Sequence, residues 1–418
     1  MNAPAVVSLQ SLRLDAAGEI RPRIRAILDK ALAGEEVGAD EAVALFGVEG
    51  AELDALTRVA DRLRERAVGD NATFVVTRNI NYTNVCNVGC KFCNFAKRRD
   101  DPEAEFFDLD EIVRRAQEAA DRGATEVCIQ GGLHPDIPGG FYRDIVKAIK
   151  ARLPDLHIHA FSPFEIWYGA RKSRMSYRDF IQDLIDQGLG SMPGTAAEIL
   201  DDDVRRRLTM NKLSTQEWVE IVKTAHGLGL PTTSTIMYGH IDGPRQWANH
   251  LALLRDIQKE TGGFTEFVPL GFIHYKTRLF RENPDVRPGP TRLEHIRMHA
   301  VARIMLAGWI DNIQASWVKL GPELARDMLA FGVNDLGGTL MNESISRAAG
   351  ATHGQEMLPE ELVRMIRSAG RHPVRRSTLY RHLEAFDAAS PPQLPVLAPA
   401  SRARRTIPIV AAAAAVLG

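Results

Sequence analysis

Three cysteines stand close together in the chain and could bind a metal cluster. Cys86, Cys90 and Cys93 lie within eight residues, and the 418-residue chain has only four cysteines in all. Thiolates at these spacings on one loop can wrap a single iron-sulfur cube, and three ligands leave one iron without a protein ligand. The triad therefore predicts a 4Fe-4S cluster whose fourth iron is open to another molecule.

Other uses of clustered cysteines fit this pattern less well. A structural zinc site wants four protein ligands, commonly as paired C-x2-C knuckles, and the chain has no second knuckle. The classical ferredoxin run has a different order of spacings, a fourth cysteine and a proline. A disulfide scaffold would spread its cysteines through a short secreted chain. The remaining cysteine, Cys128, lies in the run Glu-Val-Cys-Ile and is expected to be a small buried hydrophobe.

Short apolar runs alternate with amphipathic helices from about residue 73 onward. This alternation is typical of a parallel sheet in which each strand is followed by a helical crossover. The fold class is therefore predicted as α/β, a parallel (βα)8 TIM-type barrel with an N-terminal helical extension and C-terminal helices. Helices are expected at 108–122, 141–153, 215–228, 244–260 and 291–307, and strands at 74–82, 125–130, 156–161, 188–192, 231–238, 265–272, 312–317 and 333–336.

The barrel is expected to occupy residues 73–345, with other segments before and after it. Ile24, Ile27 and Leu28 recur at helical spacing, so residues 1–72 are predicted to be a helical extension that packs on the barrel. Residues 346–390 are predicted to be a C-terminal helical segment. The Pro- and Ala-rich residues 391–418 are expected to be a disordered or loosely helical tail.

Composition and charge favour a soluble globular protein with small-molecule partners. Hydrophobic residues make up 45% and charged residues 25% of the chain, the usual balance for a protein with a sizeable core. Fifty-two basic and 53 acidic side chains give a formal charge of −1, so no global field would attract nucleic acid or an anionic membrane. The sequence has no secretory signal pattern and no run of roughly 20 apolar residues. We expect a cytoplasmic protein.

Polar residues collect where the expected strands end, which is where barrel enzymes place their active sites. Several fixed hydrogen-bonding side chains on this rim could bind polar small molecules. The expected substrate-binding residues are Tyr82, Asn84, Thr195, Gln314, Asn334 and Asp335, and further polar rim residues are Ser162, Glu165, His240 and Glu266.

The triad resembles that of the radical S-adenosylmethionine (SAM) superfamily. Members of this superfamily share C-x3-C-x-aromatic-C, and Phe92 occupies the aromatic position here. The resemblance implies that the three cysteines ligate a 4Fe-4S cluster and that the open iron chelates the amino and carboxylate groups of S-adenosylmethionine. One electron then cleaves this molecule to methionine and a 5'-deoxyadenosyl radical. The resemblance also places Phe92 beside the adenine.

A glycine pair follows the second expected strand and corresponds to a second feature of that superfamily. The resemblance implies that Gly131 and Gly132 bind the methionyl amino group through their backbone, because glycine lets a ligand approach the main chain closely. The usual acidic third residue is Leu133 here, and a plain strand-to-helix turn is the alternative interpretation. Ser162 and Glu165, after the third expected strand, are further candidates for cofactor binding.

A narrower resemblance covers about residues 74–380. The chain looks like the group that makes the deazaflavin FO and the menaquinone precursors of the futalosine route, and within it most like the second subunit of FO synthase (CofH). The segments that carry this resemblance are 79–86, 130–135, 160–163, 192–198, 234–240, 262–270, 332–339 and 344–350.

This resemblance implies a radical SAM 4-hydroxyphenyl transferase. The 4-hydroxybenzyl group of L-tyrosine would be joined to 5-amino-6-(D-ribitylamino)uracil, with release of 2-iminoacetate, methionine and 5'-deoxyadenosine. The expected partners are these two substrates, an electron donor of the flavodoxin or ferredoxin type, and the first subunit of FO synthase (CofG), which closes the ring of the coenzyme F-420 precursor. Because the sequence has no second cysteine triad, it resembles the stand-alone subunit.

Three side chains are candidates for handling the substrates. His240 could take a proton from the tyrosine ammonium, since imidazole titrates near neutrality; a satisfied core histidine is the alternative. Glu266 could bind substrate hydroxyls, because an unpaired carboxylate in a barrel mouth would be costly. Arg347 could clamp the tyrosine carboxylate or could form a surface ion pair.

Two other functions remain open at the level of the sequence. A menaquinone-pathway relative, of the aminofutalosine synthase or the dehypoxanthinyl futalosine cyclase type, would share the barrel and the cluster. A non-catalytic iron-sulfur carrier would hold a cluster that never cleaves S-adenosylmethionine. A carrier needs no deep cavity lined by polar strand ends, which favours the enzyme.

Overall fold

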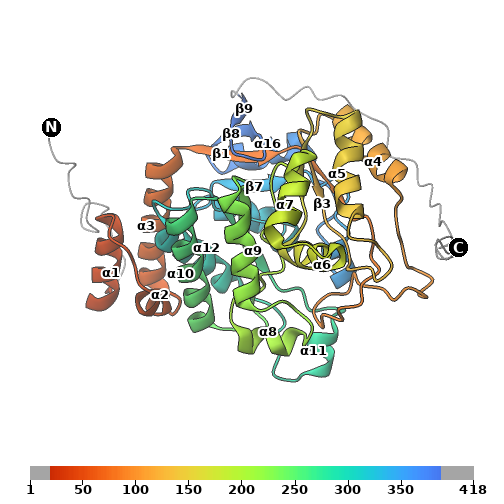
Figure 1. The fold of residues 1–418 in the computed structure, drawn as a ribbon. Helices are drawn as coiled ribbons and strands as arrows, with labels where there is room; N and C mark the ends of the chain where they lie inside the picture. The colour runs from red at the N-terminus through yellow and green to blue at the C-terminus, as the bar shows by residue number, and fades with distance from the viewer. Residues whose placement is uncertain (1–18, 387–418) are drawn as a thin grey trace, which may run out of the picture.

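Parallel strands surrounded by helices form the centre of the computed structural model, which describes residues 19–386 (Figure 1). The strands group as β7-β1-β8-β9, β2-β3-β4 and β5-β6. Neighbours within each group are parallel, except for the antiparallel pair β8 and β9. The strands are β1 Asn71–Val75, β2 Thr77–Ile80, β3 Glu126–Ile129, β4 His157–Ala160, β5 Thr232–Tyr238, β6 Phe264–Gly271, β7 Asp335–Gly338, β8 His372–Arg376 and β9 His382–Ala385.

Isolated parallel bridges connect the three groups of strands. Residues 191 and 192 bridge β4 to β5, and residues 313 and 314 bridge β6 to β7. Only Val76 separates β1 from β2. The segments 188–192 and 312–317, expected as full strands, therefore contribute two isolated bridges each. The arrangement is a TIM-barrel-like α/β fold.

Helices follow most strands and cover the outside of the sheet (Figure 1). Several begin with a Ser or Thr cap and a Glu three residues later, as in Ser162–Glu165, Ser214–Glu217 and Thr291–Glu294, a pairing that satisfies free backbone N–H groups. No helix within residues 19–386 is long and apolar enough to cross a membrane. The covering helices are α4 Leu109–Asp121, α5 Phe141–Arg152, α6 Pro163–Ser173, α7 Tyr177–Asp186, α8 Asp202–Leu208, α9 Thr215–Gly227, α10 Pro244–Thr261, α11 Arg278–Glu282, α12 Arg292–Leu306, α13 Trp317–Leu320, α14 Pro322–Met328, α15 Ile345–Ala349 and α16 Pro359–Ser368.

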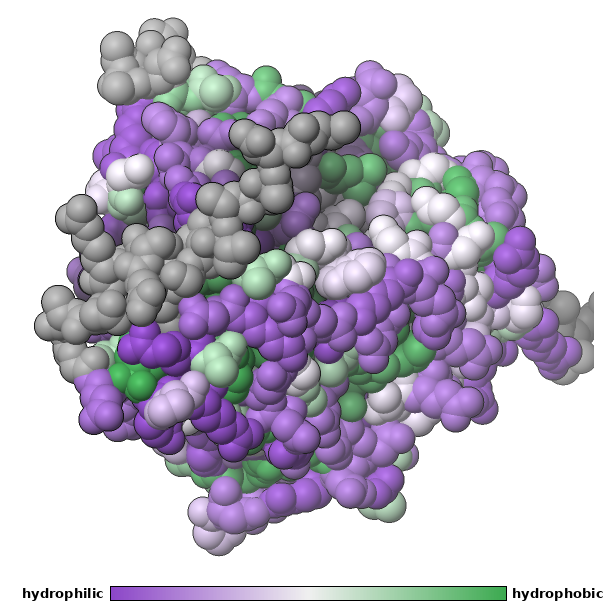
Figure 2. All heavy atoms as spheres, turned by 90° about the vertical axis from the view of Figure 1, so that its left-hand side faces the viewer, coloured by the Kyte–Doolittle hydropathy of each residue, from purple (hydrophilic) through white to green (hydrophobic). Residues whose placement is uncertain are grey.

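Three N-terminal helices lie on one side of the strands: α1 Pro22–Leu32, α2 Ala39–Leu45 and α3 Gly50–Val68. Their apolar faces are buried, and α3 packs on α12. Buried arginines of α10 and α12 hold the loops between these N-terminal helices in place. Arg255 of α10 donates to the Val37 carbonyl at 2.7 Å, and Arg297 of α12 donates to the Val48 carbonyl at 2.9 Å. The outer surface on this side is mostly hydrophilic with scattered apolar residues (Figure 2).

The C-terminal segment differs from the sequence prediction. The sequence predicts a helical segment over residues 346–390, but after α16 the chain forms the hairpin β8–β9, and β8 extends the sheet beside β1. Pro373 cannot continue a helix interior. Val374 and Phe386 are buried, and the Phe386 ring stacks on Phe74 with centroids 5.8 Å apart. Tertiary packing on β1 therefore sets the local structure here. The predicted tail, 391–418, and the first residues of the chain lie outside the described residues.

A buried charge network joins this hairpin to the amino ends of the strands. Arg376 donates to both carboxylate oxygens of Asp335, at 2.5 and 3.1 Å, and Thr73 donates to the same carboxylate. Tyr380 donates to Glu266, whose carboxylate lies 3.6 Å from the Arg376 guanidinium. Asp335 and Arg376 are buried, so each depends on the other to avoid an unpaired charge in the core.

We predict that Arg376→Met lowers the free energy of unfolding by about 3–5 kcal/mol, because it leaves Asp335 buried without its cation. Urea denaturation followed by circular dichroism measures this loss. The adjacent Arg375→Met is the control, since Arg375 is half-buried and pairs with the more exposed Glu384. Equal losses in the two variants would contradict the prediction.

Candidate active site

The cysteine loop lies directly after β2, at the carboxyl end of the strands. Cys86, Cys90 and Cys93 are half-buried and free of disulfides. Backbone hydrogen bonds fix the loop, from Cys86 N to the Lys97 carbonyl at 3.1 Å and from Cys93 N to the Cys90 carbonyl at 3.2 Å. The Lys91 N–H donates to the Leu208 carbonyl at 3.0 Å, which ties the loop to the end of α8.

The chemistry of the three thiols fits ligands of an iron-sulfur cube. Burial raises the pKa of Cys90 to about 12 and also raises that of Cys93, and neighbouring thiols of the triad add to both shifts. These thiols need a metal to hold them as thiolates. Within residues 19–386 no group of three or more His, Cys, Asp or Glu converges on one metal ion, and a cube distributes its thiolates over separate irons.

The glycine pair after β3 lets the cysteine loop lie against the sheet. A Cβ on Gly131 would be 2.5 Å from the Tyr82 ring. A Cβ on Gly132 would collide with the Val85 carbonyl and lie 2.9 Å from the Cβ of Cys86. The Gly132 N–H also donates to the carbonyl of residue 83 at 2.8 Å. Glycine is therefore required at both positions for packing.

Glu165 accepts hydrogen bonds from three predicted site residues at once. Tyr82 OH donates to it at 3.0 Å and the Gly131 N–H at 2.9 Å, while Ser162 donates its N–H at 2.8 Å and its hydroxyl at 2.7 Å. Glu165 is buried, and burial raises its pKa to about 7. The structure thus brings Tyr82, Ser162 and Glu165 together beside the glycine pair. Their polar side-chain atoms are hydrogen-bonded to one another.

Other predicted residues near the loop have defined partners. Thr195 donates to the Gln130 side chain at 2.8 Å. Asn84 donates to the Glu103 carbonyl at 2.8 Å and accepts from the Glu105 N–H at 2.7 Å, so it shapes the loop that follows the cysteines. Phe92 is half-buried, with the Lys212 ammonium 5.5 Å from its ring centroid.

The structure places Glu266, Asn334 and Asp335 at the amino ends of the strands, away from the predicted carboxyl-end rim. Glu266 is the third residue of β6, and Asp335 is the first of β7; both belong to the network around Arg376. Asn334 accepts from Arg303 at 2.8 Å and from the backbone N–H of residue 313 at 2.9 Å. The rim location expected for these three residues was wrong. Gln314, half-buried, is bridged to Asp335.

The two remaining candidates differ in exposure. His240 is fully buried, with Nε2 at 2.9 Å from the Met237 carbonyl and Nδ1 accepting from the Ile241 N–H at 2.8 Å. Burial lowers the pKa of His240, so its contacts match the alternative of a satisfied core histidine. Arg347 is exposed in α15, and the Ala348 carbonyl of that helix accepts from Asn94 of the cysteine loop at 3.3 Å.

A hollow of about 150 Å³ opens beyond the carboxyl end of β6. Sequence reasoning missed Lys319, which lines it. Burial lowers the pKa of Lys319, and the charges of Glu343 and Cys93 oppose that shift. Its position two residues after the expected strand 312–317 was the available signal. Other lining residues include Phe272, His274, Tyr275, His295 and His353.

Comparison with known proteins places the chain in a family. Residues 80–254 match the model of the radical SAM superfamily, and residues 261–389 match the model of the CofH/MqnC C-terminal region. A 5-amino-6-(D-ribitylamino)uracil--L-tyrosine 4-hydroxyphenyl transferase of Methanothermobacter thermautotrophicus is 48% identical over 365 residues, which are 87% of this chain and 99% of that protein. The chain belongs to the CofH family of radical SAM enzymes.

Other relatives extend this assignment. The transferase of Methanopyrus kandleri is 49% identical over 86% of this chain and 97% of its own length. The FO synthase of Streptomyces avermitilis is 51% identical over 85% of this chain, but the match spans only 42% of that longer protein.

Solved structures of distant relatives agree with the fold. Methylornithine synthase (PylB) has a TM-score of 0.67 at 18% identity over 84% of this chain and 97% of its own. The FeFe-hydrogenase maturase HydG from Carboxydothermus hydrogenoformans has a TM-score of 0.66 at 17% identity, over 86% of this chain and 80% of its own. At these identities the likeness supports the fold alone.

The close approach at the glycine pair predicts that Gly132→Ala impairs cluster loading, because the new methyl group must displace the start of the cysteine loop. The measurement is iron and sulfide content after anaerobic reconstitution, expected to fall several-fold. Gly227→Ala is the control, since a Cβ there meets nothing within 4 Å. Full loading of both variants would show that the loop tolerates the displacement.

The buried carboxyl of Glu165 predicts a pH dependence of stability. The pKa of Glu165 is raised from 4.5 to about 7 in the folded state. The protonated carboxyl therefore contributes fully to the free energy of unfolding below pH 4.5, and this contribution is lost as the pH rises to 7. Between these values the free energy of unfolding of the wild type should fall by up to ~3 kcal/mol relative to Glu165→Gln. Urea titrations at several pH values measure it, and parallel curves for the two proteins would refute it.

Proposed function

We propose that this chain is the radical SAM transferase that joins the 4-hydroxybenzyl group of L-tyrosine to 5-amino-6-(D-ribitylamino)uracil. The products would be the coupled adduct, 2-iminoacetate, methionine and 5'-deoxyadenosine. The observation that carries the proposal is the match over nearly the full length of a relative with that name. The cysteine triad at the carboxyl end of the strands supports it, since barrel active sites lie there.

The chain's own residues would position the cofactors. Cys86, Cys90 and Cys93 would hold a 4Fe-4S cluster, and Phe92 and the glycine pair would lie along bound S-adenosylmethionine. When bound, the two cofactors supply one-electron cleavage that yields a 5'-deoxyadenosyl radical. The Glu165 carboxylate would position Tyr82 and the Gly131 backbone beside this site.

We also infer a complete barrel around this site. Eight parallel segments would form it, with residues 191–192 and 313–314 counted as short strands because they bridge their neighbours on both sides. The barrel would span about residues 73–345, after a helical extension in 1–72. Residues 346–386 would then close its amino end with the hairpin β8–β9.

We propose that this chain carries only part of the chemistry of its pathway. Because the match covers less than half of the FO synthase, we propose that a separate CofG-type subunit closes the deazaflavin ring in coenzyme F-420 biosynthesis. An electron donor of the flavodoxin or ferredoxin type would supply the electron. A cytoplasmic location would suit this set of partners.

A menaquinone-pathway activity is the second candidate. The specific observation in its favour is that the C-terminal family model covers MqnC as well as CofH proteins. The relatives that are about 50% identical to this chain are named as the transferase or as FO synthase, which favours the tyrosine reaction.

The test is an anaerobic assay of reconstituted enzyme with reductant, S-adenosylmethionine, L-tyrosine and the ribitylaminouracil. Mass spectrometry should detect 5'-deoxyadenosine and the coupled adduct in the wild type and in Cys128→Ala. Neither should form in Cys90→Ala, since that variant lacks a cluster ligand. Cys128 is a matched control because it is the one cysteine outside the triad.

Other outcomes would redirect the assignment. Turnover of futalosine derivatives in place of tyrosine would favour the menaquinone pathway. A fully loaded cluster that never cleaves S-adenosylmethionine would favour a non-catalytic carrier.

A further inference from the structure

Residues 342–356 form a long loop between β7 and α16. The ends of this loop are joined, because the Met357 N–H donates to the Thr339 carbonyl at 3.1 Å and the Glu343 N–H donates to the Gln355 carbonyl at 2.9 Å. Between these points the chain forms one short helix, α15. The loop therefore has a narrow base, a form that is common among functional surface loops.

This loop has little apolar packing on the rest of the molecule. Its only large hydrophobic side chain is that of Ile345, which is 37% exposed. Burial of apolar surface is the main favourable contribution to folding, and segments with few buried apolar contacts open at a low cost in free energy. We therefore expect the loop to open more readily than β7 and α16, which it connects.

Two long hydrogen bonds hold the far end of the loop. Asn94, in the cysteine loop, donates its side-chain N–H to the Ala348 carbonyl at 3.3 Å. The Lys276 N–H, in the segment after β6, donates to the Ala349 carbonyl at 3.3 Å. Both distances exceed the commonest N–H···O distance of about 2.9–3.0 Å. The far end is therefore held less tightly than the base.

The backbone at the start of the loop has an unfavourable conformation. Leu340 and Met341 have positive φ angles of 62° and 48°. The left-handed region costs free energy in residues other than glycine, and strained residues of this kind are concentrated at clamps and switch regions. These two residues lie where a movement of residues 342–356 would have to begin.

The loop covers one side of the hollow beyond β6. Ala351, Thr352 and His353 line this hollow together with Tyr275. The backbone of Gly350 packs directly on the same tyrosine, since a Cβ on Gly350 would lie 2.9 Å from the Cβ of Tyr275. A displacement of the loop would therefore widen the hollow.

A second loop, residues 209–214, also contacts the cysteine loop. Asn211 donates to the Val88 carbonyl at 3.4 Å. Lys212 forms an ion pair with Glu198 at 2.9 Å, and the two side chains are only 4% and 9% exposed. This second loop is therefore held by a buried side chain of its own.

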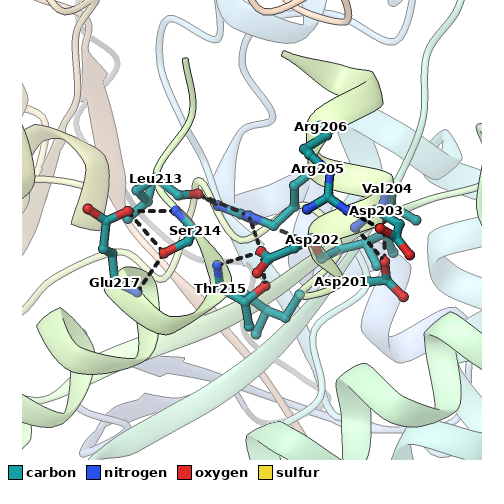
Figure 3. Close-up of polar contacts among 12 residues, drawn as sticks. Asp201, Asp202, Asp203, Val204, Arg205, Arg206, Leu213, Ser214, Thr215 and Glu217 are labelled. Carbon is teal, nitrogen blue, oxygen red and sulfur yellow. Dashed lines mark hydrogen bonds and ion pairs between the residues drawn. The ribbon is translucent and has the colours of Figure 1, made fainter. Parts of the chain in front are cut away.

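Figure 3 shows the framework that fixes the second loop. Arg205, which is buried in α8, donates to the Leu213 carbonyl at 2.7 and 3.1 Å. Ser214 and Glu217 form the capping box that begins α9. The second loop thus continues directly into a capped helix, whereas residues 342–356 depend at their far end on two long hydrogen bonds.

We propose that residues 342–356 form a lid that opens to admit ligands to the hollow and closes over them. The base at Thr339 and Met357 stays in place, and the contacts of Ala348 and Ala349 break when the lid opens. Asn94 directly follows Cys93, so the closed position of the lid depends on the position of the cysteine loop. The lid is inferred from the structure alone, but the choice of S-adenosylmethionine and L-tyrosine as its ligands rests on the proposed function.

Hydrogen–deuterium exchange followed by mass spectrometry measures the opening of each segment without turnover. In the anaerobically reconstituted protein, the amides of residues 342–356 should exchange faster than those of β7 and α16. S-adenosylmethionine and L-tyrosine are then added separately and together. Closure of the lid over a ligand should slow the exchange of residues 342–356 and leave the exchange of β7 and α16 unchanged.

Asn94→Ala removes one of the two hydrogen bonds at the far end of the lid. We expect exchange of residues 342–356 to become about 3- to 10-fold faster, because the loss of one hydrogen bond shifts the opening equilibrium by that factor. Asn211→Ala is the matched control, since it removes a similarly long hydrogen bond between the cysteine loop and the second loop. The control should leave the exchange of the lid unchanged.

Gly350→Ala tests the contact with Tyr275. The new methyl group meets that side chain, and φ at this position is 106°, so the variant should also speed the exchange of the lid. Gly370→Ala is the matched control, because its φ is 72° and a Cβ there meets nothing within 4 Å. Iron content is measured for every variant.

Exchange of residues 342–356 as slow as that of β7, and unchanged in Asn94→Ala and Gly350→Ala, would overturn the proposal. Protection of the lid by neither ligand would also overturn it. Protection by S-adenosylmethionine but not by L-tyrosine would support the lid and count against the proposed tyrosine reaction. If Asn94→Ala fails to load its cluster, Gly350→Ala decides, because this glycine is far from the triad in sequence.

Discussion

The cysteine loop can lie against the sheet only because the end of β3 presents two glycines to it. Any side chain at Gly132 would occupy the space of the Val85 carbonyl and of the Cys86 side chain. This contact sets where the loop begins and so where all three thiols lie. Glu165 reinforces it from the first turn of α6, since one carboxylate accepts hydrogen bonds from both the Gly131 N–H and the Tyr82 hydroxyl.

The two ends of the strands differ in how their buried charged groups are paired. At the amino end Arg376 and Asp335 complete each other, and the buried charges have partners. At the carboxyl end Glu198 Oε2 has none among the described residues, and Lys319 borders a hollow. A stable core tolerates charge that is fully paired, whereas a binding site needs groups that a ligand can complete.

The sequence predicted the chemistry better than the location of individual side chains. The spacing of the triad and the glycine pair is local information, and the alternation of strands and helices follows from hydrophobic periodicity. Glu266 and Asp335 were misplaced because their partner, Arg376, comes from a distant hairpin that was expected to be helical. The burial of His240 and its hydrogen bonds to nearby backbone groups could not be predicted from a pattern of side chains. Glu198 and Lys212 meet only after two irregular loops fold around Arg205.

The hairpin β8–β9 also makes the completion of the sheet around β1 depend on a segment that is synthesised long after β1. Arg371, just before β8, binds Asp70, just before β1, across 301 residues of chain. Contacts so far apart in sequence form slowly, because a long loop must close before they can be made. Until β8 has been made, one edge of β1 is unpaired and Asp335 lacks Arg376. The cysteine loop is therefore synthesised well before the strand that covers β1 and supplies Arg376, and unpaired strand edges of this kind favour aggregation of incomplete chains.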